Sequence, residues 1–469
     1  MTKLLTALIL SLVMSASATV WYVDNTATGT HDGSSWQNAW TSIGQITGLA
    51  AGDTVYISGG PSGSSQYYAV SSWNPAGGNS SAPITYQIGQ DSSHNGTAIF
   101  DGSGNWLISW HQYLTISGNA GDGLMHFSLA NPANNTSYYG EVWSNPGAST
   151  YSFGVHLAYI NFGQIAVAFD TWPFENPPSE IDHTYAYINS SASADHWGNF
   201  STVAGTTWDN GLLIHDNVMF LPCGAGSAVG CDGPQVSGTG VSVYNNYETS
   251  YVGQGANHQD GFQSLTETYL KVYNNFFYGM GQSTIFCDTF PPPAPQHIRI
   301  YNNISVACAN GIEMGDDGSS GSGGSAFNDI QVDNNITAPG SAGHGGSGIA
   351  SHWAGSTFTA CQFANNILVD CSQTTAPYYS GSSSSNITTT SAAATSIFVN
   401  YIAASTNSDF HLKSTALAEI LQGTNLSAYF TTDYSNSVRQ ATGNWDIGAY
   451  LYGTNQPSGA VNGFRIFVQ

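Results

Sequence analysis

The chain has 469 residues, enough for one large domain or up to about three ordinary ones. Charged residues make up 7% of it, against roughly 25% in a typical globular protein. The 6 Lys and Arg residues stand against 29 Asp and Glu, for a formal net charge of −23. This deficit of cations excludes the basic surface that nucleic-acid binding requires. The 54 Gly residues and the 13% aromatic content favour a β-rich protein with many turns over a disordered chain.

Residues 1–18 are typical of a secretory signal peptide. Lys3 supplies the positive start, Leu4–Val13 the apolar run and Ala16–Ala18 the small residues of a cleavage site. The apolar run is too short to span a bilayer as a stable helix. We therefore expect cleavage after Ala18 and a secreted protein, extracellular or periplasmic, with no membrane contact after cleavage.

Six cysteines in an exported chain permit disulfides. Cys223 and Cys231 flank a short Gly/Ala/Ser loop and form the best local pair. The sequence alone does not choose among the 15 possible connectivities of six cysteines. No two cysteines have the C-x-x-C spacing of a zinc or redox site, so no metal ligand is predicted.

A repeated pattern is the most informative feature of the sequence. Short β-type runs end in Asn, and successive terminal Asn residues are 28 to 32 positions apart. The runs are His156–Asn161, Thr184–Asn189, Leu212–Asn217, Val241–Asn246, Leu270–Asn275, Ile298–Asn303, Ile330–Asn335 and Cys361–Asn366. Apolar and polar residues alternate in each run, which predicts one buried face. We expect each terminal Asn to take a left-handed corner conformation and to bond the Asn residues of neighbouring coils.

This period predicts an all-β solenoid. A unit of about 28 residues is too short for a propeller blade, and it suits a coil of three short strands stacked about 4.8 Å from the next. The sequence resembles the right-handed parallel β-helix (pectin-lyase-like) superfamily of secreted carbohydrate-active proteins. Its opening and closing segments are similar to the entry and final coils of that superfamily: Trp21–Asp24, Asp32–Trp40, Ala50–Ile57, Asp409–Leu412 and Trp445–Tyr450.

The resemblance implies a single right-handed parallel β-helix domain over residues 19–469, with about ten to twelve three-strand coils. We expect an N-terminal cap and early coils over 19–119. Regular coils are expected over 120–395, and closing coils over 396–469.

In this superfamily the substrate groove usually follows the strand that precedes each Asn-terminated run. The corresponding segments here are Asp260–Leu265, Thr284–Thr289, Gly311–Asp317 and Gly348–Trp353. Aligning these segments predicts four inward-facing side chains, those of Phe262, Ile285, Ile312 and Ile349. Alternation then produces two outward columns. The first holds Gln263, Phe286, Glu313 and Ala350, and the second holds Leu265, Asp288, Gly315 and His352.

The two columns place Asp288 and Glu313 on neighbouring coils, offset by two residues. Strand geometry puts their backbone positions roughly 8 Å apart. This distance lies within the roughly 6.5–9.5 Å range between the carboxyl groups of inverting glycosidases. One carboxylic acid would protonate the leaving oxygen, while the other would activate water.

Asp260 is a third candidate acid or base. Asn257–Phe262 resembles the Asn-x-Asp-Gly segment of polygalacturonase-type hydrolases, which implies a catalytic Asp260, with His258 as a supporting residue. The adjacent pair Asp316 and Asp317 comes one coil later than the pair of that family, and no Arg-x-Lys exists to bind a uronate. Structural alternatives remain open: Asp260 as a turn residue, His258 as a partner of a corner carbonyl, and the Asp pair as a loop cap or calcium ligands.

Further residues are candidates for substrate binding. Trp353 and Trp197 offer flat apolar faces for sugar rings, and His352 adjoins the first of them. Gln263 and Phe286 belong to the predicted outward column. A half-buried surface position is the alternative reading for the Trp residues and His352.

Hydrolysis of a neutral or weakly charged polysaccharide is the favoured function. Lyases of this fold commonly use Lys or Arg, and Lys271 and Arg299 lie in the Asn-terminated runs, away from the groove strands. A calcium-assisted lyase and a non-catalytic glycan-binding adhesin remain alternatives. The expected partner is a polysaccharide, no cofactor is required, and calcium is possible.

Overall fold

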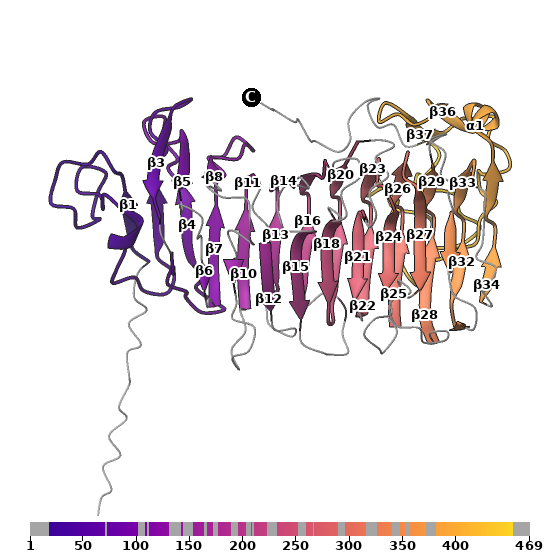
Figure 1. Cartoon of the computed structure of the whole chain (residues 1–469), viewed down its shortest axis with the longest axis horizontal. Helices are drawn as coiled ribbons and strands as arrows, with labels where there is room; N and C mark the ends of the chain where they lie inside the picture. Colours follow the sequence, from indigo (N-terminus) through magenta and orange to yellow (C-terminus); the bar gives the residue numbers. More distant parts are fainter. Residues whose placement is uncertain are drawn as a thin grey trace, which may run out of the picture.

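The computed structural model describes most of the chain after the expected signal peptide. The described residues are 18–70, 73–101, 108–109, 112–130, 142–143, 153–163, 167–171, 177–188, 196–202, 208, 211–222, 232–251, 259–265, 267–288, 296–315, 326–339, 348–351, 356–371 and 381–453. They form a parallel β-solenoid whose coils stack along the long axis of the molecule (Figure 1). The fold class predicted from the repeats is thereby confirmed.

Three parallel sheets run along the stack, and from β12 (Val167–Thr171) to β30 (Ile349–Ser351) the coils contribute a strand to each of them. The first sheet has 14 strands. Its members are β1 (Val20–Val23), β2 (Thr54–Ile57), β4 (Ile84–Ile88), β7 (Gln112–Ser117), β10 (Phe153–Ala158), β13 (Ser179–Asp182), β16 (Leu212–His215), β19 (Val241–Tyr244), β22 (Thr268–Tyr273), β25 (Gln296–Tyr301), β28 (Ala326–Asp333), β32 (Gln362–Ala364) and β34 (Ser382–Ser384), with β31 (Thr357–Thr359) beside β28.

The second sheet has 12 short strands. They are β3 (Ser65–Ala69), β5 (Thr97–Asp101), β8 (Phe127–Ala130), β11 (Ile160–Gly163), β14 (Tyr185–Tyr187), β17 (Val218–Phe220), β20 (Tyr247–Thr249), β23 (Phe276–Tyr278), β26 (Ile304–Val306), β29 (Ile336–Ala338), β33 (Ile367–Val369) and β35 (Ile387–Thr389). The third sheet has seven strands. They are β12 (Val167–Thr171), β15 (His196–Thr202), β18 (Asp232–Ser237), β21 (Phe262–Leu265), β24 (Ser283–Asp288), β27 (Asn310–Gly315) and β30 (Ile349–Ser351).

Small elements complete the described structure. They are the 3-10 turn η1 (Ile43–Gln45), the helix α1 (Ser391–Ile397), the parallel pair β6 (Ile108–Ser109) and β9 (Val142–Trp143), and the antiparallel pair β36 (Phe398–Asn400) and β37 (Asp409–Leu412). No helix among the described residues is long and apolar enough to cross a membrane. Residues 1–17 of the expected signal peptide lie outside the described part of the chain.

The interior is a stack of apolar side chains, one layer per coil. On the third sheet, Phe262 is in register with Ile285, which pairs with Ile312, and Ile312 pairs with Ile349. All four side chains are buried, with exposed fractions of 0% or 1%. The inward column predicted from the sequence is therefore confirmed. Burial of such large apolar side chains is the main stabilising contribution that each coil makes.

An asparagine ladder joins the coils at the turn between the first and second sheets. The backbone N–H and the side-chain amide of Asn217 both donate to Oδ1 of Asn246, each at 3.0 Å. Asn246 donates in the same way to Asn275, at 2.9 and 3.0 Å. The pattern continues through Asn303, Asn335, Asn366 and Asn386. The predicted bonding between the Asn residues of successive coils is confirmed.

The corner conformation differs from the prediction by one position. The left-handed residue precedes the ladder Asn, as at Asp216, Asn245 and Asn274, with φ of 54°, 55° and 56°. A ladder Asn must present its backbone N–H to the next coil, so the residue before it makes the turn. In the paired Asn-Asn sequences, the first residue turns the chain and the second forms the ladder.

Two of the eight predicted ladder positions were assigned to the wrong residues. Asn161 lies in β11, and its Oδ1 accepts a local hydrogen bond from Gly163 N at 3.0 Å. In the following coil the ladder position is held by Thr184, whose N–H and hydroxyl donate to Oδ1 of Asn217 at 3.0 and 2.7 Å. Asn189 lies outside the described residues.

The structure describes four of the six cysteines. Cys287, Cys308 and Cys361 are buried, and Cys371 is half-buried. Cys223 and Cys231, the pair favoured from the sequence, lie outside the described residues. Among the described cysteines, the expectation of a disulfide finds no support.

Candidate functional site

The outward columns predicted for the third sheet have the register expected from the sequence. Gln263 pairs with Phe286, and Phe286 pairs with Glu313. In the second column Leu265 pairs with Asp288, and Asp288 pairs with Gly315. Asp288 and Glu313 therefore lie on neighbouring strands, β24 and β27, offset by two residues. We call the part of the third sheet that carries positions Gln263, Phe286, Asp288 and Glu313 the third-sheet face.

The third-sheet face is shielded from bulk water where its side chains are described. Gln263, Phe286 and Glu313 are 3%, 3% and 2% exposed. The Glu313 carboxylate accepts a hydrogen bond from the hydroxyl of Ser283 on the adjacent strand. Gln235 donates to Gln263 at 2.6 Å, which links β18 to β21 through side chains. Polar groups buried on an outer sheet surface have to be held by such contacts.

Asp260 has a clear structural role at the start of the third sheet. Its Oδ1 accepts a hydrogen bond from Ser283 N at 2.9 Å, and its own N–H donates to Oδ1 of Asp232 at 2.7 Å. Asp232 and Asp260 thus join three successive coils in the same manner as the asparagine ladder. Asp260 is 0% exposed. This arrangement agrees with the structural alternative stated for Asp260 from the sequence. It does not test whether Asp260 also takes part in catalysis.

Several predicted site residues fall outside the described part of the chain. These are His258, Asp316, Asp317, His352 and Trp353. Asp288 and Trp197 have described backbone positions in β24 and β15. The structure therefore places Asp288, Glu313, Gln263 and Phe286 together through strand register.

The described cations all lie away from the third sheet. Lys271 and Arg299 are on β22 and β25 of the first sheet, where Arg299 binds Asp329 with two hydrogen bonds of 2.9 Å. Lys413 donates to Thr395 O at 2.6 Å, and Arg439 is 2% exposed and donates to Ala449 O at 3.0 Å. Within the described residues, no Lys or Arg is placed to act on a substrate at the third-sheet face.

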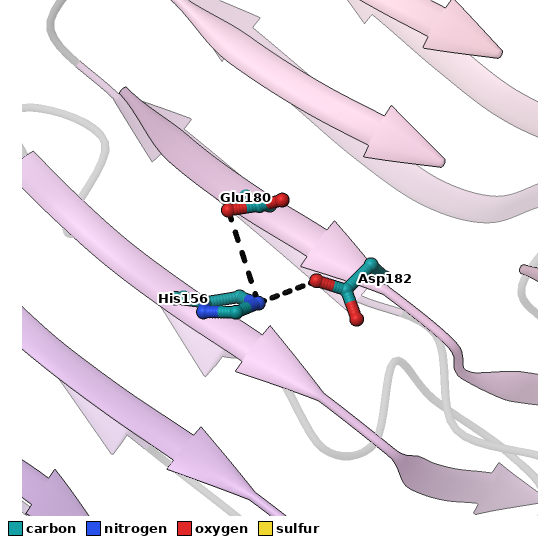
Figure 2. Close-up of side chains that lie close together, drawn as sticks. All are labelled: His156, Glu180 and Asp182. Atoms are coloured by element: carbon teal, nitrogen blue, oxygen red, sulfur yellow. Dashed lines mark hydrogen bonds and ion pairs between the residues drawn. The ribbon is translucent and has the colours of Figure 1, made fainter. Parts of the chain in front are cut away.

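A second concentration of reactive side chains lies on the outward face of the first sheet. His156 on β10 is in register with Glu180 on β13, and Asp182 follows two residues later on the same face. Figure 2 shows the three side chains converging between the two strands. Nε2 of His156 is 2.5 Å from Oδ2 of Asp182 and 3.9 Å from Oε2 of Glu180. The three ligand-type atoms lie within 4.8 Å of one another.

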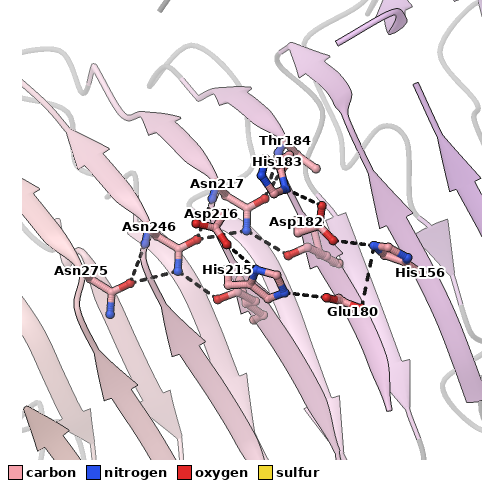
Figure 3. Close-up of polar contacts among 12 residues, drawn as sticks. His156, Glu180, Asp182, His183, Thr184, His215, Asp216, Asn217, Asn246 and Asn275 are labelled. Carbon is pink, nitrogen blue, oxygen red and sulfur yellow. Dashed lines mark hydrogen bonds and ion pairs between the residues drawn. The ribbon is translucent and has the colours of Figure 1, made fainter. Parts of the chain in front are cut away.

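Three more side chains extend this group into a chain of alternating imidazole and carboxylate groups (Figure 3). Nδ1 of His183 is 2.7 Å from the second oxygen of Asp182, Oδ1. Nε2 of His215 is 2.6 Å from Oε1 of Glu180, and its Nδ1 is 2.7 Å from Asp216. We call the complete set the histidine–carboxylate cluster: His156, Glu180, Asp182, His183, His215 and Asp216.

The contacts in this cluster favour the charged forms of His215, Glu180 and Asp182. Burial would lower the pKa of His215, but its hydrogen bonds to Asp216 and Glu180 outweigh burial and raise the pKa to about 9. The hydrogen bond from His215 lowers the pKa of Glu180 despite the cost of desolvation. Burial opposes ionisation of Asp182, yet hydrogen bonds from His156 and His183 hold its pKa well below the usual range. The carboxylates are therefore available as anionic ligands or proton acceptors near neutral pH.

The sequence carries a signal for this cluster in the same repeats that predict the solenoid. His156 opens one of the Asn-terminated runs, His215 lies inside another, and Asp182 lies two residues before a third. Register places Asp182 beside both Ala158 and His215 on the same sheet face. Aligning the outward positions of the first sheet by its repeats therefore predicts that these residues lie close together.

No protein-family model matches the sequence, and no curated protein matches it. Solved structures match at the level of overall shape. A pectate lyase, Pel9A, is 12% identical with a TM-score of 0.44, over 93% of this chain and 97% of that one. The GH136 lacto-N-biosidase from Eubacterium ramulus is 11% identical with a TM-score of 0.43, over 79% and 67%. A mannuronic acid specific polysaccharide family 6 lyase from human gut microbiota is 13% identical with a TM-score of 0.41, over 72% and 77%. Similarity at this level does not assign an activity to this chain.

Proposed function

We propose that the protein is a secreted enzyme that hydrolyses a neutral or weakly charged polysaccharide at the third-sheet face. The observation that carries this proposal is the strand register. Phe286 pairs with Glu313 while Asp288 pairs with Gly315, so two acidic residues lie on adjacent strands with a two-residue offset. Strand spacing then gives a backbone separation of roughly 8 Å between Asp288 and Glu313.

If the two side chains extend in parallel from the sheet, their carboxyl groups keep about the same separation as the backbone positions, which fits an inverting mechanism. Inverting glycosidases keep their two carboxyl groups roughly 6.5–9.5 Å apart, which leaves room for a water molecule. One of the pair, Asp288 or Glu313, would protonate the glycosidic oxygen as the bond breaks. The other would take a proton from water as it attacks the anomeric carbon from the opposite side. The second proton of that water stays on the new hydroxyl group of the sugar, so the reaction balances without a cofactor.

The environment of Glu313 supports this role. The residue is 2% exposed, next to the apolar ring of Phe286, and its carboxylate is positioned by Ser283. A carboxyl group shielded from water and fixed by a hydrogen bond can be held in one orientation for proton transfer. Asp260 is a further candidate acid or base, with His258 and the pair Asp316 and Asp317 as supporting residues.

Sugar binding is proposed for a wider set of residues around this pair. They are Gln263, Phe286, His352, Trp353 and Trp197. An amide side chain offers both a donor and an acceptor to a sugar hydroxyl, and aromatic rings stack on the apolar face of a pyranose. A net charge of −23 makes long-range attraction of polyanionic glycans unfavourable, which supports a neutral or weakly charged substrate.

A lyase is the second candidate, because the histidine–carboxylate cluster offers imidazole bases and anionic ligands. β-Elimination next to a uronate needs a cation to neutralise the carboxylate and a base to remove the proton. The described Lys and Arg side chains are engaged elsewhere, so a lyase would depend on a metal ion, with calcium as the usual one in this fold. A non-catalytic glycan-binding role is the remaining alternative.

The test is a survey of purified protein against neutral polysaccharides and uronate polymers, with and without a chelator. Hydrolysis predicts new reducing ends from a neutral glycan, no ultraviolet absorbance from unsaturated uronates, and no effect of the chelator. Unsaturated products that disappear with the chelator would replace the proposal with a metal-assisted lyase. Glycan binding without any product would replace it with a binding role.

A further inference from the structure

The histidine–carboxylate cluster has the donor set of a metal centre. His156 contributes an imidazole nitrogen, and Glu180 and Asp182 contribute one carboxylate oxygen each. Imidazole nitrogen combined with carboxylate oxygen suits transition ions such as Zn²⁺, whereas Ca²⁺ and Mg²⁺ prefer oxygen ligands alone. The chemistry of the donors therefore points to a different ion from the calcium expected of this fold.

The spacing of the three atoms is compatible with one ion between them. Ligand atoms at bonds of about 2.0–2.2 Å from a common ion lie about 3–4 Å apart. Nε2 of His156 is 3.9 Å from Oε2 of Glu180 and 2.5 Å from Oδ2 of Asp182. The distance to Glu180 already lies in this range. The distance to Asp182 would enter the range after a small rotation of the imidazole or the carboxylate. Register fixes the backbone beneath them, because His156 pairs with Glu180 and Ala158 pairs with Asp182.

The groups around these ligands hold their orientation. The second oxygen of Asp182 is held by His183 at 2.7 Å, and the second oxygen of Glu180 by His215 at 2.6 Å. Each supporting imidazole is stacked on a tyrosine, His183 on Tyr159 and His215 on Tyr244, with ring centroids 4.5 Å apart in both pairs. Outer hydrogen bonds of this kind orient metal-binding side chains and increase their affinity.

The site is reachable from solvent, and no Lys or Arg among the described residues forms an ion pair with Glu180 or Asp182. The side chains of His156 and Glu180 are 33% and 30% exposed, while that of Asp182 is 7% exposed. Among the described residues, every ion pair of Glu180, Asp182 and Asp216 is with a histidine.

We propose that His156, Glu180 and Asp182 bind one divalent transition-metal ion of the Zn²⁺ class on the outward face of the first sheet. His183 and His215 are positioning residues that orient the two carboxylates. With three protein ligands, the ion retains open positions for water or for a ligand oxygen. This site lies on a different sheet from the proposed hydrolytic pair, so its existence does not depend on the proposed function.

The test is calorimetric titration of tag-free, chelator-treated protein with ZnCl₂ and, separately, with CaCl₂. We expect one Zn²⁺ per chain, with the stoichiometric event lost in both His156→Ala and Glu180→Gln. His183→Ala should retain the event with affinity weakened about 10- to 100-fold, as for other outer-shell partners. Circular dichroism confirms that each variant is folded before titration.

The matched control is His126→Ala. His126 also pairs with an aspartate, Asp122, at 3.0 Å, but it lies in a separate turn. This variant should bind Zn²⁺ as the unmodified protein does. Absence of a stoichiometric Zn²⁺ event in the unmodified protein would overturn the proposal, as would binding that survives both His156→Ala and Glu180→Gln. Calcium binding of equal affinity that is independent of His156 would overturn the assignment of the metal class.

Discussion

Asn246 and Asn275 are joined by two hydrogen bonds, because the backbone N–H and the side-chain amide of Asn246 both donate to Oδ1 of Asn275, at 2.9 and 3.0 Å. Asn275 in turn donates through its own side chain to Val243 O and to Asn303, each at 3.0 Å. The Asn275 side chain thus satisfies two backbone groups of the preceding coil and bonds the Asn303 side chain of the following one, and both Asn246 and Asn275 are buried. This relationship sets the register on which the proposed hydrolytic pair depends.

Asn275→Ala should destabilise the protein by about 3 kcal/mol, since it leaves buried donors of Asn246 and the carbonyl of Val243 without their partner. The measurement is equilibrium unfolding in urea. Asn161→Ala is the matched control, because Asn161 makes only a local hydrogen bond to Gly163 N among the described contacts. The control should lose less than about 1 kcal/mol. Equal losses in the two variants would contradict the structural importance of the ladder.

The burial of Glu248 leads us to expect a contribution to stability that is largest at acidic pH. The residue is 0% exposed, and neither carboxylate oxygen has a hydrogen-bond partner among the described residues. Burial raises the pKa of Glu248 well above its usual value of 4.5. Its protonated form is favoured in the folded state, so this stabilisation is complete below about pH 4.5 and is lost as pH rises through the folded pKa.

Glu248→Gln should therefore raise the Tm at neutral pH, because the amide stays uncharged. Each unit by which the folded pKa exceeds the unfolded value corresponds to about 1.4 kcal/mol. Thermal unfolding measured from about pH 3 to pH 8 should show the two proteins converging at low pH. A Tm difference that is the same at every pH would show that folding does not raise the pKa of Glu248.

The close packing around Gly233, near the start of β18, leaves no room for a larger residue at this position. A Cβ there would lie 1.8 Å from Gly261 O and 2.4 Å from Oε2 of Glu248. The first of these atoms belongs to the backbone of the next coil and cannot move without disturbing the sheet. Gly233→Ala should lower stability by about 3 kcal/mol, the upper end of the usual cost of overpacking. In contrast, Gly44→Ala has nothing within 4 Å of the added carbon, and it should leave the unfolding midpoint nearly unchanged.

The fold was predictable because every coil of the solenoid has the same structural requirements. Each coil must bury one apolar face and close one corner, so alternation and Asn recur with a fixed period in the sequence. The same regularity made the columns of the third sheet predictable, including the neighbouring positions of Asp288 and Glu313. Where the repeat was irregular, prediction failed: Thr184 holds the ladder position in a coil where the sequence pattern pointed to Asn189.

The contacts of the histidine–carboxylate cluster depend on side-chain rotamers, which the repeat period of the sequence does not specify. Register places His215 beside Asp182, yet its Nε2 reaches Glu180 at 2.6 Å, a choice made by side-chain rotamers. The role of Asp260 was similarly open, because an Asp before Gly fits both a catalytic carboxylate and the backbone contact to Ser283 that the structure contains. Such alternatives are distinguished by side-chain geometry, which strand alternation does not specify.

The most direct test of the proposed hydrolytic pair is the rate of reducing-end release by Asp288→Asn and Glu313→Gln, measured on the neutral glycan that the unmodified protein cleaves. Asp122→Asn, a change in a turn remote from the third sheet, is the control for loss of one acidic side chain. Both test variants should remain folded and lose about 10²- to 10⁴-fold in kcat, the usual contribution of a general acid or base, while the control retains its rate. Folded variants that cleave as fast as the control would contradict the assignment of catalysis to Asp288 and Glu313.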